Sequence, residues 1–313
     1  MKVALIDDFH PKIIKTLKEW DWDIIHAQKW SAHELKNSPK GINGIFIRSR
    51  LPLNEDILKH FNDLKFIARP GSGLENIDLD YCDKNKIKVF RSPEGNRDAV
   101  AEHAIGMLLM LLNNLKIADT EVRNGIWKRS ENRGYELKGK TFAIIGYGYM
   151  GEALSKRLSG FGMNVIAYDK YLSNYENLLV REVQLNEVFL KADFVSLHTP
   201  LTTETFGMIN SDFIEKFKKP FYFLNTARGN AVVLKDLLKG LQNRHILGAC
   251  LDVLDLESSS FENVDFSTNP YFSSLCKMQN VILSPHIAGW TYESKEKMAD
   301  VILQKIKNKY LTQ

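Results

Sequence analysis

Three side chains in this sequence have the types that proton and anion chemistry on a 2-oxo acid needs. Arg228, Glu257 and His286 each follow a short apolar run that predicts a strand. A guanidinium can bind a carboxylate bidentately, and an imidazole can move the proton of a hydroxyl group. A carboxylate beside that imidazole can stabilise its protonated form and fix its tautomer. The set predicts interconversion of a 2-hydroxy acid and a 2-oxo acid, provided that a hydride carrier also binds.

A glycine-rich loop, Gly146-Tyr-Gly-Tyr-Met-Gly151, lies upstream of these residues, between a predicted strand and a predicted helix. In dinucleotide-binding loops the first glycine allows a tight turn and the second lets the main chain approach a pyrophosphate. The third allows the helix to pack closely on the strand. Tyr149 and Met150 lie in the same loop, just before the predicted helix, whose free N–H groups suit a pyrophosphate. The loop therefore predicts a dinucleotide site that includes Gly146, Gly148, Tyr149, Met150 and Gly151.

Asp169 ends the next predicted strand, close to the position expected for an acid that binds the adenine ribose. A carboxylate can accept hydrogen bonds from both ribose hydroxyls of NAD, and it would repel the extra phosphate of NADP. Lys170 follows directly and would weaken that repulsion. NAD is therefore the expected cofactor.

Strand-length apolar runs alternate with helical patterns along the sequence, which is typical of βαβ units and a parallel sheet. The first series of predicted strands covers residues 3–6, 23–26, 44–47, 66–68 and 88–90. The second covers 142–145, 165–168, 194–197, 221–224, 247–251 and 281–283, and six strands are enough for a complete dinucleotide-binding sheet. Helices are predicted over 11–20, 54–61, 152–161, 234–241 and 292–309. A further helix over 99–115 would link two domains, and polar residues 258–269 predict a surface loop.

Composition favours an ordinary globular protein and gives little support to nucleic-acid or membrane partners. The 313 residues carry a net charge of +4, with lysines and acids interspersed and no basic block among aromatic residues. No apolar stretch reaches the roughly 20 residues that span a bilayer, and residues 1–8 do not resemble a signal peptide. Cys82, Cys250 and Cys276 fit neither a disulfide framework nor a metal site. We therefore expect a cytoplasmic protein without a metal.

Several short motifs, in a fixed order, resemble the D-isomer-specific 2-hydroxyacid dehydrogenases over nearly the whole length. They are Arg48-Ser-Arg50, residues 71–78, Asn96 with residues 99–103, residues 146–151, His198-Thr-Pro200 with Thr205, Thr226-Ala-Arg-Gly229, residues 252–257 and Pro285-His-Ile-Ala-Gly289. The resemblance implies an α/β fold of two Rossmann-like, doubly wound parallel-sheet domains with the active site in the cleft between them. It implies a substrate-binding domain of residues 1–98 plus 287–313 and an NAD-binding domain of residues 99–286.

The resemblance also assigns roles to individual residues. Arg228, Glu257 and His286 match the catalytic arginine, glutamate and histidine of the family. The main-chain N–H groups around Ser72 and Gly73 match a loop that receives the substrate carboxylate. Asp252 matches an acid on the nicotinamide side of the cofactor. Further cofactor contacts are expected from His198, Thr199, Pro200, Thr205, Thr226, Ala227 and Gly289.

Two departures from the family pattern and two further histidines bear on this assignment. Glu257 is followed by Ser258 where proline is common, and residue 254 is Leu where Phe is common. Both changes concern the loop that carries Glu257, so its role is less secure than those of Arg228 and His286. His103 is expected to be structural, and His198 is expected to pack at the cofactor rather than to react.

Arg48, Ser49 and Arg50 bear on the substrate. The 3-phosphoglycerate dehydrogenases of the family often have this basic pair, and two guanidiniums would match a dianionic phosphate. The sequence is most similar to those enzymes, which suggests oxidation of 3-phosphoglycerate to 3-phosphohydroxypyruvate in serine biosynthesis. Alternatively, one arginine only pairs with a local acid. The sequence stops at residue 313, so we expect no regulatory domain and no feedback inhibition by serine.

Two other functions stay open at this stage. One is a hydroxypyruvate or glyoxylate reductase, and the other is an NAD(H)-sensing corepressor-like binding protein with the same fold. Retention of the Arg, Glu and His set favours an enzyme, although those corepressors keep it too. A homodimer is expected, because the family commonly dimerises near the apolar helix that begins at Ala99.

Overall fold

The computed structural model describes residues 1–38, 40–256 and 269–312. The chain forms two compact units, which are considered separately below. Unit 1 contains Met1–Arg97 and residues 290–312, and unit 2 contains residues 98–256 and 269–289. Unit 1 is therefore discontinuous in sequence, since the last helix of the chain belongs to it. Which unit binds the substrate stays a prediction.

Unit 1 is a five-stranded parallel sheet with the strand order β2-β1-β3-β4-β5. The strands are β1 (Lys2–Leu5), β2 (Asp23–His26), β3 (Gly44–Phe46), β4 (Phe66–Arg69) and β5 (Lys88–Arg91). The helices are α1 (Pro11–Glu19), α2 (Ala32–Lys36), α3 (Glu55–Leu58), α4 (Leu79–Lys84) and α12 (Tyr292–Tyr310). All five predicted strands are present. The predicted helix over 54–61 is shorter than expected, and α2 and α4 were not predicted.

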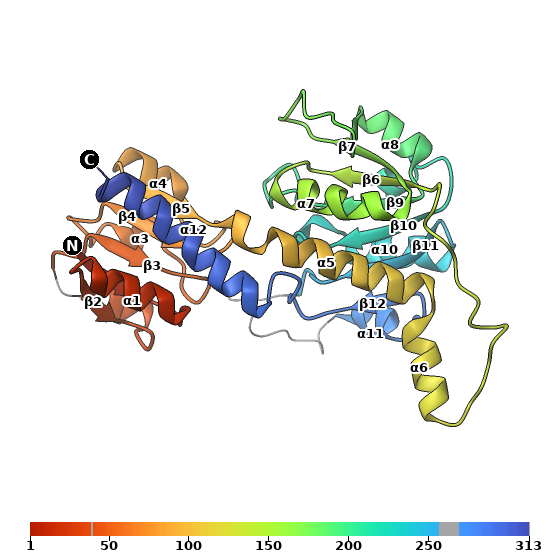
Figure 1. The fold of residues 1–313 in the computed structure, drawn as a ribbon, viewed down its shortest axis with the longest axis horizontal. Helices are drawn as coiled ribbons and strands as arrows, with labels where there is room; N and C mark the ends of the chain where they lie inside the picture. Colours follow the sequence, from red (N-terminus) through yellow and green to blue (C-terminus); the bar gives the residue numbers. More distant parts are fainter. Residues whose placement is uncertain (39, 257–268, 313) are drawn as a thin grey trace. The chain divides into compact units, whose positions relative to one another are not determined.

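Helices cover both faces of this sheet. On one face Ile13 and Leu17 of α1 pack with Ile302 and Ile306 of α12, and the two helices lie side by side (Figure 1). Leu35, Ile57 and Cys82 from α2, α3 and α4 pack on the other face. The inner strands β1, β3 and β4 are buried on both faces, which explains why they appear as continuous apolar runs in the sequence, whereas the edge strands β2 and β5 are partly exposed.

Unit 2 is a seven-stranded parallel sheet with the order β12-β11-β10-β9-β6-β7-β8. The strands are β6 (Thr141–Ile145), β7 (Asn164–Tyr168), β8 (Arg181–Glu182), β9 (Phe194–Leu197), β10 (Phe221–Asn225), β11 (Ile246–Leu251) and β12 (Val281–Leu283). The helices are α5 (Pro93–Leu112), whose first turn belongs to unit 1, α6 (Leu115–Arg123), α7 (Tyr149–Leu158), α8 (Leu185–Lys191), α9 (Ser211–Ile214), α10 (Leu234–Gln242) and α11 (Pro270–Cys276). The six predicted strands are confirmed. The seventh, β8, was missed because two residues give no apolar run.

The prediction of a single helix over residues 99–115 is wrong at both ends. α5 begins at Pro93 and ends at Leu112, and α6 follows after a bend of 62°. Asn114 between them has a φ of 51°, a left-handed conformation that asparagine tolerates better than most residues. Within the described part of the chain, no single helix has the length and apolarity to cross a membrane, and only α5 and α6 taken as a bent pair meet those criteria.

The strand order of unit 2 reverses direction at β6. The chain builds β7 and β8 on one side of β6, and β9 to β12 on the other side. In open α/β sheets, ligands bind at the carboxyl ends of the strands, where the order reverses. The fold therefore directs attention to the loops that follow β6 and β9, and the predicted α/β class with parallel sheets is confirmed.

Candidate functional site

The glycine-rich loop follows β6 directly. Gly146 has a φ of 93°, and a Cβ atom there would lie 2.8 Å from the main-chain carbonyl carbon and oxygen of His198. A Cβ atom at Gly151 would lie 2.6 Å from the carbonyl oxygen of Gly146. The first glycine thus serves the turn, and the third serves the packing of α7. Both positions exclude any other residue without a shift of the main chain.

Gly148 is the N-cap residue of α7, and it provides no side-chain hydrogen bond to the first turn of that helix. A Cβ atom at Gly148 would meet nothing within 4 Å, so the space beside it is open. Tyr149 and Met150 form the first turn of this ten-residue helix. A helix start with no side-chain cap, beside open space, fits a pyrophosphate, because the N-terminal end of a helix attracts anions.

Three buried polar atoms at the carboxyl ends of β9 and β10 have no hydrogen-bond partner among the described residues. They are Nδ1 of His198 and Oγ1 of Thr199, after β9, and Oγ1 of Thr226, after β10. The two strands are neighbours in the sheet. Buried polar atoms are nearly always bonded, so an unbonded group of three suggests that a ligand supplies the partner. These residues fit the predicted dinucleotide site.

His198 itself is held in its neutral form. Its Nε2 atom lies 2.8 Å from Oγ of Ser196, and burial lowers the pKa of His198 to about 4. A neutral imidazole has one N–H donor and one acceptor nitrogen, so Nδ1 of His198 can form one hydrogen bond with a ligand, but the ring is not protonated to act as a general acid at neutral pH. This agrees with the expectation that His198 packs at the cofactor.

Thr205 and Ala227 have local partners. Oγ1 of Thr205 donates to the carbonyl oxygen of Pro200 at 2.6 Å and accepts from the main-chain N–H of Thr202 at 2.8 Å. The main-chain N–H of Ala227 donates to Oδ1 of Asn225 at 3.0 Å. Thr205 therefore shapes the loop after β9, and the predicted contacts of Pro200, Thr205 and Ala227 with the cofactor stay predictions.

Asp169 joins two loops at the same edge of the sheet. Its Oδ2 atom accepts from the main-chain N–H of Tyr147 at 2.8 Å, and Oδ1 accepts from those of Tyr171 and Leu172 at 2.9 Å each. A carboxylate has about four acceptor sites, so ribose hydroxyls can still bind. Asp169 thus fixes the glycine-rich loop in addition to its predicted role.

Lys170, which could have favoured NADP, is paired elsewhere. Its ammonium group forms an ion pair with Glu204, which also accepts a 2.8 Å hydrogen bond from the hydroxyl of Tyr171. The hydrogen bond to Glu204 raises the pKa of Lys170. Because Glu204 offsets the charge of Lys170, the turn after β7 keeps a negative balance, which favours NAD over NADP.

Arg228 follows β10, and Asn225 at the end of that strand shapes its turn. The buried Asn225 accepts from Ala227 and donates through Nδ2 to the carbonyl oxygen of Arg228 at 2.9 Å. The guanidinium of Arg228 donates to the carbonyl oxygen of Ala227 at 2.6 Å. No role was predicted for Asn225 from the sequence, although a polar residue at the end of a buried strand could have suggested that it positions the turn.

His286 lies in a loop after β12 and has a φ of 54°, which is unusual for a residue with a side chain. The buried Asp252, after the neighbouring strand β11, holds this loop. Its carboxylate accepts from Oγ of Ser284 at 2.6 Å and from the N–H groups of Ile287 and Ala288 at 2.9 Å each. Its carbonyl oxygen accepts from the N–H of His286 at 2.7 Å. Asp252 was predicted to contact the cofactor, and the structure adds that it organises the His286 loop.

The parallel strands bring these predicted residues to one edge of unit 2. The residues after β6, β9, β10, β11 and β12 all lie at carboxyl ends of neighbouring strands. Glu257 lies outside the described residues, as does the predicted loop over 258–268, so its approach to His286 stays a prediction. Asn269 is described and caps α11. Among the described residues, no group of three or more His, Cys, Asp or Glu side chains could hold a metal ion.

In unit 1, Ser72 and Gly73 follow β4. Oγ of Ser72 donates to Oδ1 of Asn96 at 2.9 Å, and the carbonyl oxygen of Ser72 accepts from Arg91 at 3.3 Å. The main-chain N–H groups of Ser72 and Gly73 have no partner within the described ranges. Two free N–H groups beside an arginine fit the predicted carboxylate loop.

Arg50 has another role than the one expected. Its guanidinium donates to the carbonyl oxygens of Ile6 at 2.7 Å and Trp30 at 2.7 Å, and to that of Ala27 at 3.2 Å. Its Nε atom also lies 3.6 Å from the carboxylate of Asp7. Nearly all its N–H groups are used by the main chain, so the structural alternative accounts for Arg50 better than phosphate binding.

Arg48 differs from Arg50 in this respect. Its guanidinium carbon lies 4.7 Å from the ring centre of Trp290, and Lys295 lies 5.0 Å from the same ring. Within the part of the chain that the structure describes, the guanidinium of Arg48 forms no hydrogen bond or ion pair. Arg48 is therefore the member of the predicted pair that can bind an anion.

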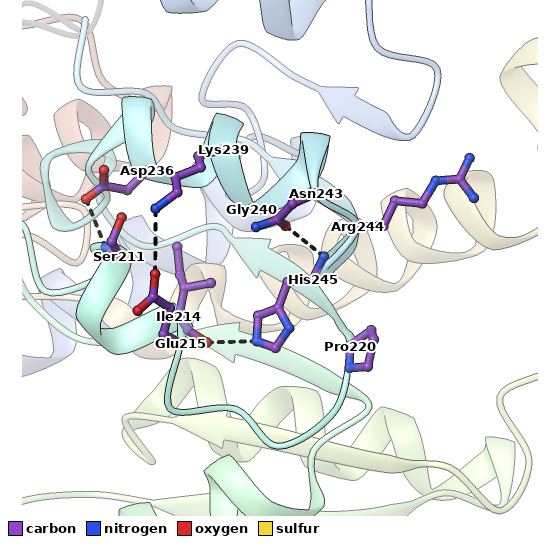
Figure 2. A pocket seen from close by; sticks show the side chains of 10 residues that line it. All are labelled: Ser211, Ile214, Glu215, Pro220, Asp236, Lys239, Gly240, Asn243, Arg244 and His245. Atoms are coloured by element: carbon purple, nitrogen blue, oxygen red, sulfur yellow. Dashed lines mark hydrogen bonds and ion pairs between the residues drawn. The ribbon is translucent and has the colours of Figure 1, made fainter.

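A surface pocket elsewhere on unit 2 does not compete with this site (Figure 2). It is lined by Ser211, Ile214, Glu215, Pro220, Asp236, Lys239, Gly240, Asn243, Arg244 and His245. Its polar groups bind one another: Lys239 lies 3.6 Å from Glu215, and Nε2 of His245 lies 3.0 Å from the carbonyl oxygen of Ile214. The pocket adjoins the start of β11, at the amino ends of the strands and away from the carboxyl ends described above.

Comparison with known proteins supports the same interpretation. Residues 105–288, more than half of the chain, match the family model "D-isomer specific 2-hydroxyacid dehydrogenase, NAD binding domain". Human D-3-phosphoglycerate dehydrogenase is 31% identical over 317 residues, which cover 99% of this chain and 57% of that protein. Glyoxylate reductase of Thermococcus litoralis is 36% identical over 264 residues, which cover 81% of this chain and 76% of that protein. The chain thus spans little more than half the length of the D-3-phosphoglycerate dehydrogenases it matches.

The fold is also shared with solved structures. D-lactate dehydrogenase from Aquifex aeolicus, in complex with NAD and lactic acid, superposes with a TM-score of 0.82 at 30% sequence identity. The match covers 98% of this chain and 94% of that one. The resemblance that the sequence motifs indicated is confirmed, and residues 105–288 form an NAD-binding domain.

Proposed function

Because the chain belongs to the D-isomer specific 2-hydroxyacid dehydrogenase family, we propose that it transfers a hydride between NAD and a D-2-hydroxy acid. The observation that carries this proposal is the carboxyl edge of the seven-stranded sheet. There, buried polar atoms of His198, Thr199 and Thr226 have no partner among the described residues, and the start of α7 at the same edge has no side-chain cap. NAD supplies or accepts the hydride when it is bound, and the remaining tasks belong to the side chains of this chain.

We assign the proton and the carboxylate to separate residues. Arg228 binds the substrate carboxylate and polarises the adjacent carbonyl group, helped by the N–H groups of Ser72 and Gly73. His286 gives its proton to the carbonyl oxygen during reduction and takes it from the hydroxyl group during oxidation. Glu257 fixes the tautomer of His286 and stabilises its protonated form. His286→Asn should therefore lower turnover about 10²- to 10⁴-fold while NADH affinity stays nearly unchanged.

For the substrate we propose 3-phosphoglycerate, with 3-phosphohydroxypyruvate as the oxidised form. Similarity to D-3-phosphoglycerate dehydrogenases over 99% of this chain supports this choice. So does Arg48, a cation in unit 1 whose guanidinium has no hydrogen-bond partner in the described ranges. Reduction of glyoxylate is the second candidate, favoured by the 36% identity with glyoxylate reductase.

A steady-state assay with NADH and a panel of 2-oxo acids tests the function. The panel holds 3-phosphohydroxypyruvate, hydroxypyruvate and glyoxylate, and kcat/KM is compared among them. We expect the phosphorylated substrate to be preferred. A preference for glyoxylate or hydroxypyruvate would favour the second candidate, and NADH binding without turnover on any 2-oxo acid would contradict an enzymatic function.

Arg48 and Arg50 form a matched pair for the phosphate. Losing a charge-assisted contact costs about 1.5–3 kcal/mol, or roughly ten- to a hundred-fold in affinity. Arg48→Ala should lower kcat/KM by that factor for 3-phosphohydroxypyruvate and much less for hydroxypyruvate. Arg50→Ala should lower thermal stability and affect both substrates alike. Equal losses in Arg48→Ala would exclude Arg48 from phosphate binding.

Two further proposals concern assembly and location. The chain forms a homodimer through apolar side chains of α6 and the segment after it, because Leu115, Val122, Ile126, Trp127 and Tyr135 are all exposed, Trp127 at 77%. Light scattering should show a dimer that Trp127→Glu weakens.

A reducing, cytoplasmic setting suits the three cysteines, which are all free thiols. Fractionation of the source cells tests this location.

A further inference from the structure

His103, in the middle of α5, contacts the loop that carries His286. Its Nε2 atom lies 2.9 Å from Oγ of Ser284 and 3.5 Å from Oδ1 of Asp252. Ser284 precedes His286 by two residues, so a residue about 180 positions earlier in the sequence reaches the loop. From the sequence, His103 was expected to have only a structural role.

The direction of these hydrogen bonds follows from their lengths. The hydroxyl of Ser284 has one hydrogen, and its oxygen lies 2.6 Å from Oδ1 of Asp252 but 3.6 Å from Sδ of Met107. A carboxylate only accepts, and the shorter contact takes the hydrogen. Oγ of Ser284 must then accept from His103, which requires a proton on Nε2. The result is a directed chain from His103 through Ser284 to Asp252.

Asp252 in turn fixes the conformation of His286. Its carboxylate accepts from the N–H groups of Ile287 and Ala288, and its carbonyl oxygen accepts from that of His286. The left-handed φ of His286, 54°, is disfavoured for a residue with a Cβ atom and persists only where surrounding contacts enforce it. No lysine or arginine among the described residues pairs with the buried Asp252, and Nε2 of His103 lies 3.5 Å from its Oδ1 atom.

We propose that His103 is a positioning residue for the reaction: through Ser284 and Asp252, its Nε2–H group maintains the main-chain conformation that presents the imidazole of His286. This inference rests on the proposed function, since it assumes that His286 moves the proton. It predicts that any side chain at residue 103 that keeps an N–H donor at the place of Nε2 preserves the conformation of the His286 loop. Misplacement of a reacting group by about 1 Å can lower turnover by roughly a hundred-fold.

Two variants at this position separate the donor from the rest of the side chain. His103→Leu removes the donor, whereas His103→Gln keeps an N–H group near the place of Nε2. His245→Leu is the control, because Nε2 of His245 also bonds in unit 2, at 3.0 Å to the carbonyl oxygen of Ile214, but at the pocket away from the loop. Two quantities are measured for each protein: kcat with KM for NADH, and the amide hydrogen exchange of Ile287 and Ala288 by NMR.

We expect His103→Leu to lower kcat about ten- to a hundred-fold, to leave KM for NADH within about two-fold, and to speed exchange at Ile287 and Ala288 by ten-fold or more. His103→Gln should restore most of both quantities, and His245→Leu should change neither. Amides of β10 serve as the internal reference, because a general loss of stability would speed their exchange too.

Unchanged exchange at Ile287 and Ala288 in His103→Leu would overturn the proposal, whatever happens to kcat. So would equal losses in the Leu and Gln variants. These outcomes are distinct from failure of the proposed function, in which the wild type reduces none of the 2-oxo acids. In that case the exchange rates, which need no substrate, still decide whether His103 holds the loop.

Discussion

At the carboxyl ends of the strands, most buried side-chain polar atoms of unit 1 are hydrogen-bonded, whereas several of those in unit 2 have no partner among the described residues. Arg50 occupies the carbonyl oxygens of Ile6, Ala27 and Trp30, and Asp7 accepts from the N–H of Arg48. In unit 2, His198, Thr199 and Thr226 each keep a buried, unbonded polar atom at the corresponding edge. Unit 1 has one such atom among its described residues, Oδ1 of Asn76.

The helix that follows the first strand of each sheet, α1 after β1 and α7 after β6, shows the same contrast. In unit 1, Nδ1 of His10 accepts from the N–H of Lys12 at 3.4 Å and so caps the start of α1. In unit 2, Gly148 gives the start of α7 no side-chain partner. Two sheets of the same parallel type thus differ in the groups they leave without a partner among the described residues. In unit 2 these are buried side-chain atoms beside the sheet's carboxyl edge, which suit a dinucleotide, and in unit 1 they are the N–H groups of Ser72 and Gly73 and the guanidinium of Arg48, which suit an anion.

The largest effect is expected at Gly146. In Gly146→Val, the added Cβ atom would meet the main chain of His198 at 2.8 Å, at a φ of 93°. Strain and clash of this kind cost at least several kcal/mol, so NADH affinity should fall by more than about a hundred-fold. Fluorescence titration with NADH measures this. Gly106→Ala is the control and should bind NADH normally, because a Cβ atom there meets nothing within 4 Å. Normal NADH binding by Gly146→Val would show that the dinucleotide binds elsewhere.

An effect of intermediate size is expected on the stability of the protein at low pH, because of His198. Burial lowers its pKa from 6.5 to about 4, so between these values the unfolded protein holds a proton on His198 that the folded protein lacks. Stability from this group is therefore present above about pH 6.5 and is lost as the pH falls towards 4. At about pH 5 the loss is on the order of 2 kcal/mol.

Urea unfolding of the wild type and of His198→Gln at about pH 7 and about pH 5 tests this prediction. Other titrating groups contribute equally to both proteins, so the variant should lose less stability on acidification. An identical pH dependence in the two proteins would show that His198 is not a buried neutral group.

The smallest expected effect is a change in stability that has opposite signs for a substitution in unit 2 and one in unit 1. Thr226→Val removes an unbonded buried hydroxyl, so stability should stay the same or rise by up to about 1 kcal/mol, while NADH affinity falls up to ten-fold. Ser92→Ala in unit 1 removes the acceptor of the Gly71 N–H group at 3.1 Å and should cost about 1–2 kcal/mol. Thermal unfolding and NADH titration measure both. If Thr226→Val is less stable than the wild type and binds NADH normally, the hydroxyl of Thr226 has a partner within the protein, and the contrast between the carboxyl edges of the two sheets does not hold.

The sequence predicted the strands well and the short helices poorly. Strands such as β6 and β9 are buried on both faces and appear as apolar runs. Helices α2, α4 and α9 have six residues or fewer, too few to show a helical period. The strand β8 pairs only through Arg181 and Glu182, which carry no apolar signal. These elements form because neighbouring structure provides their partners.

The sequence by itself determined the glycine-rich loop, the acid after β7 and the positions of Arg228 and His286, because each depends on local turn chemistry at a strand end. Only the tertiary structure decided what holds them. It assigned Arg50 to main-chain carbonyls and left Arg48 as the unbonded cation. It also joined His103, Ser284 and Asp252 to the His286 loop across α5, β11 and β12. Hydrogen bonds between residues far apart in sequence depend on how helices and strands pack, and no local pattern in the chain encodes them.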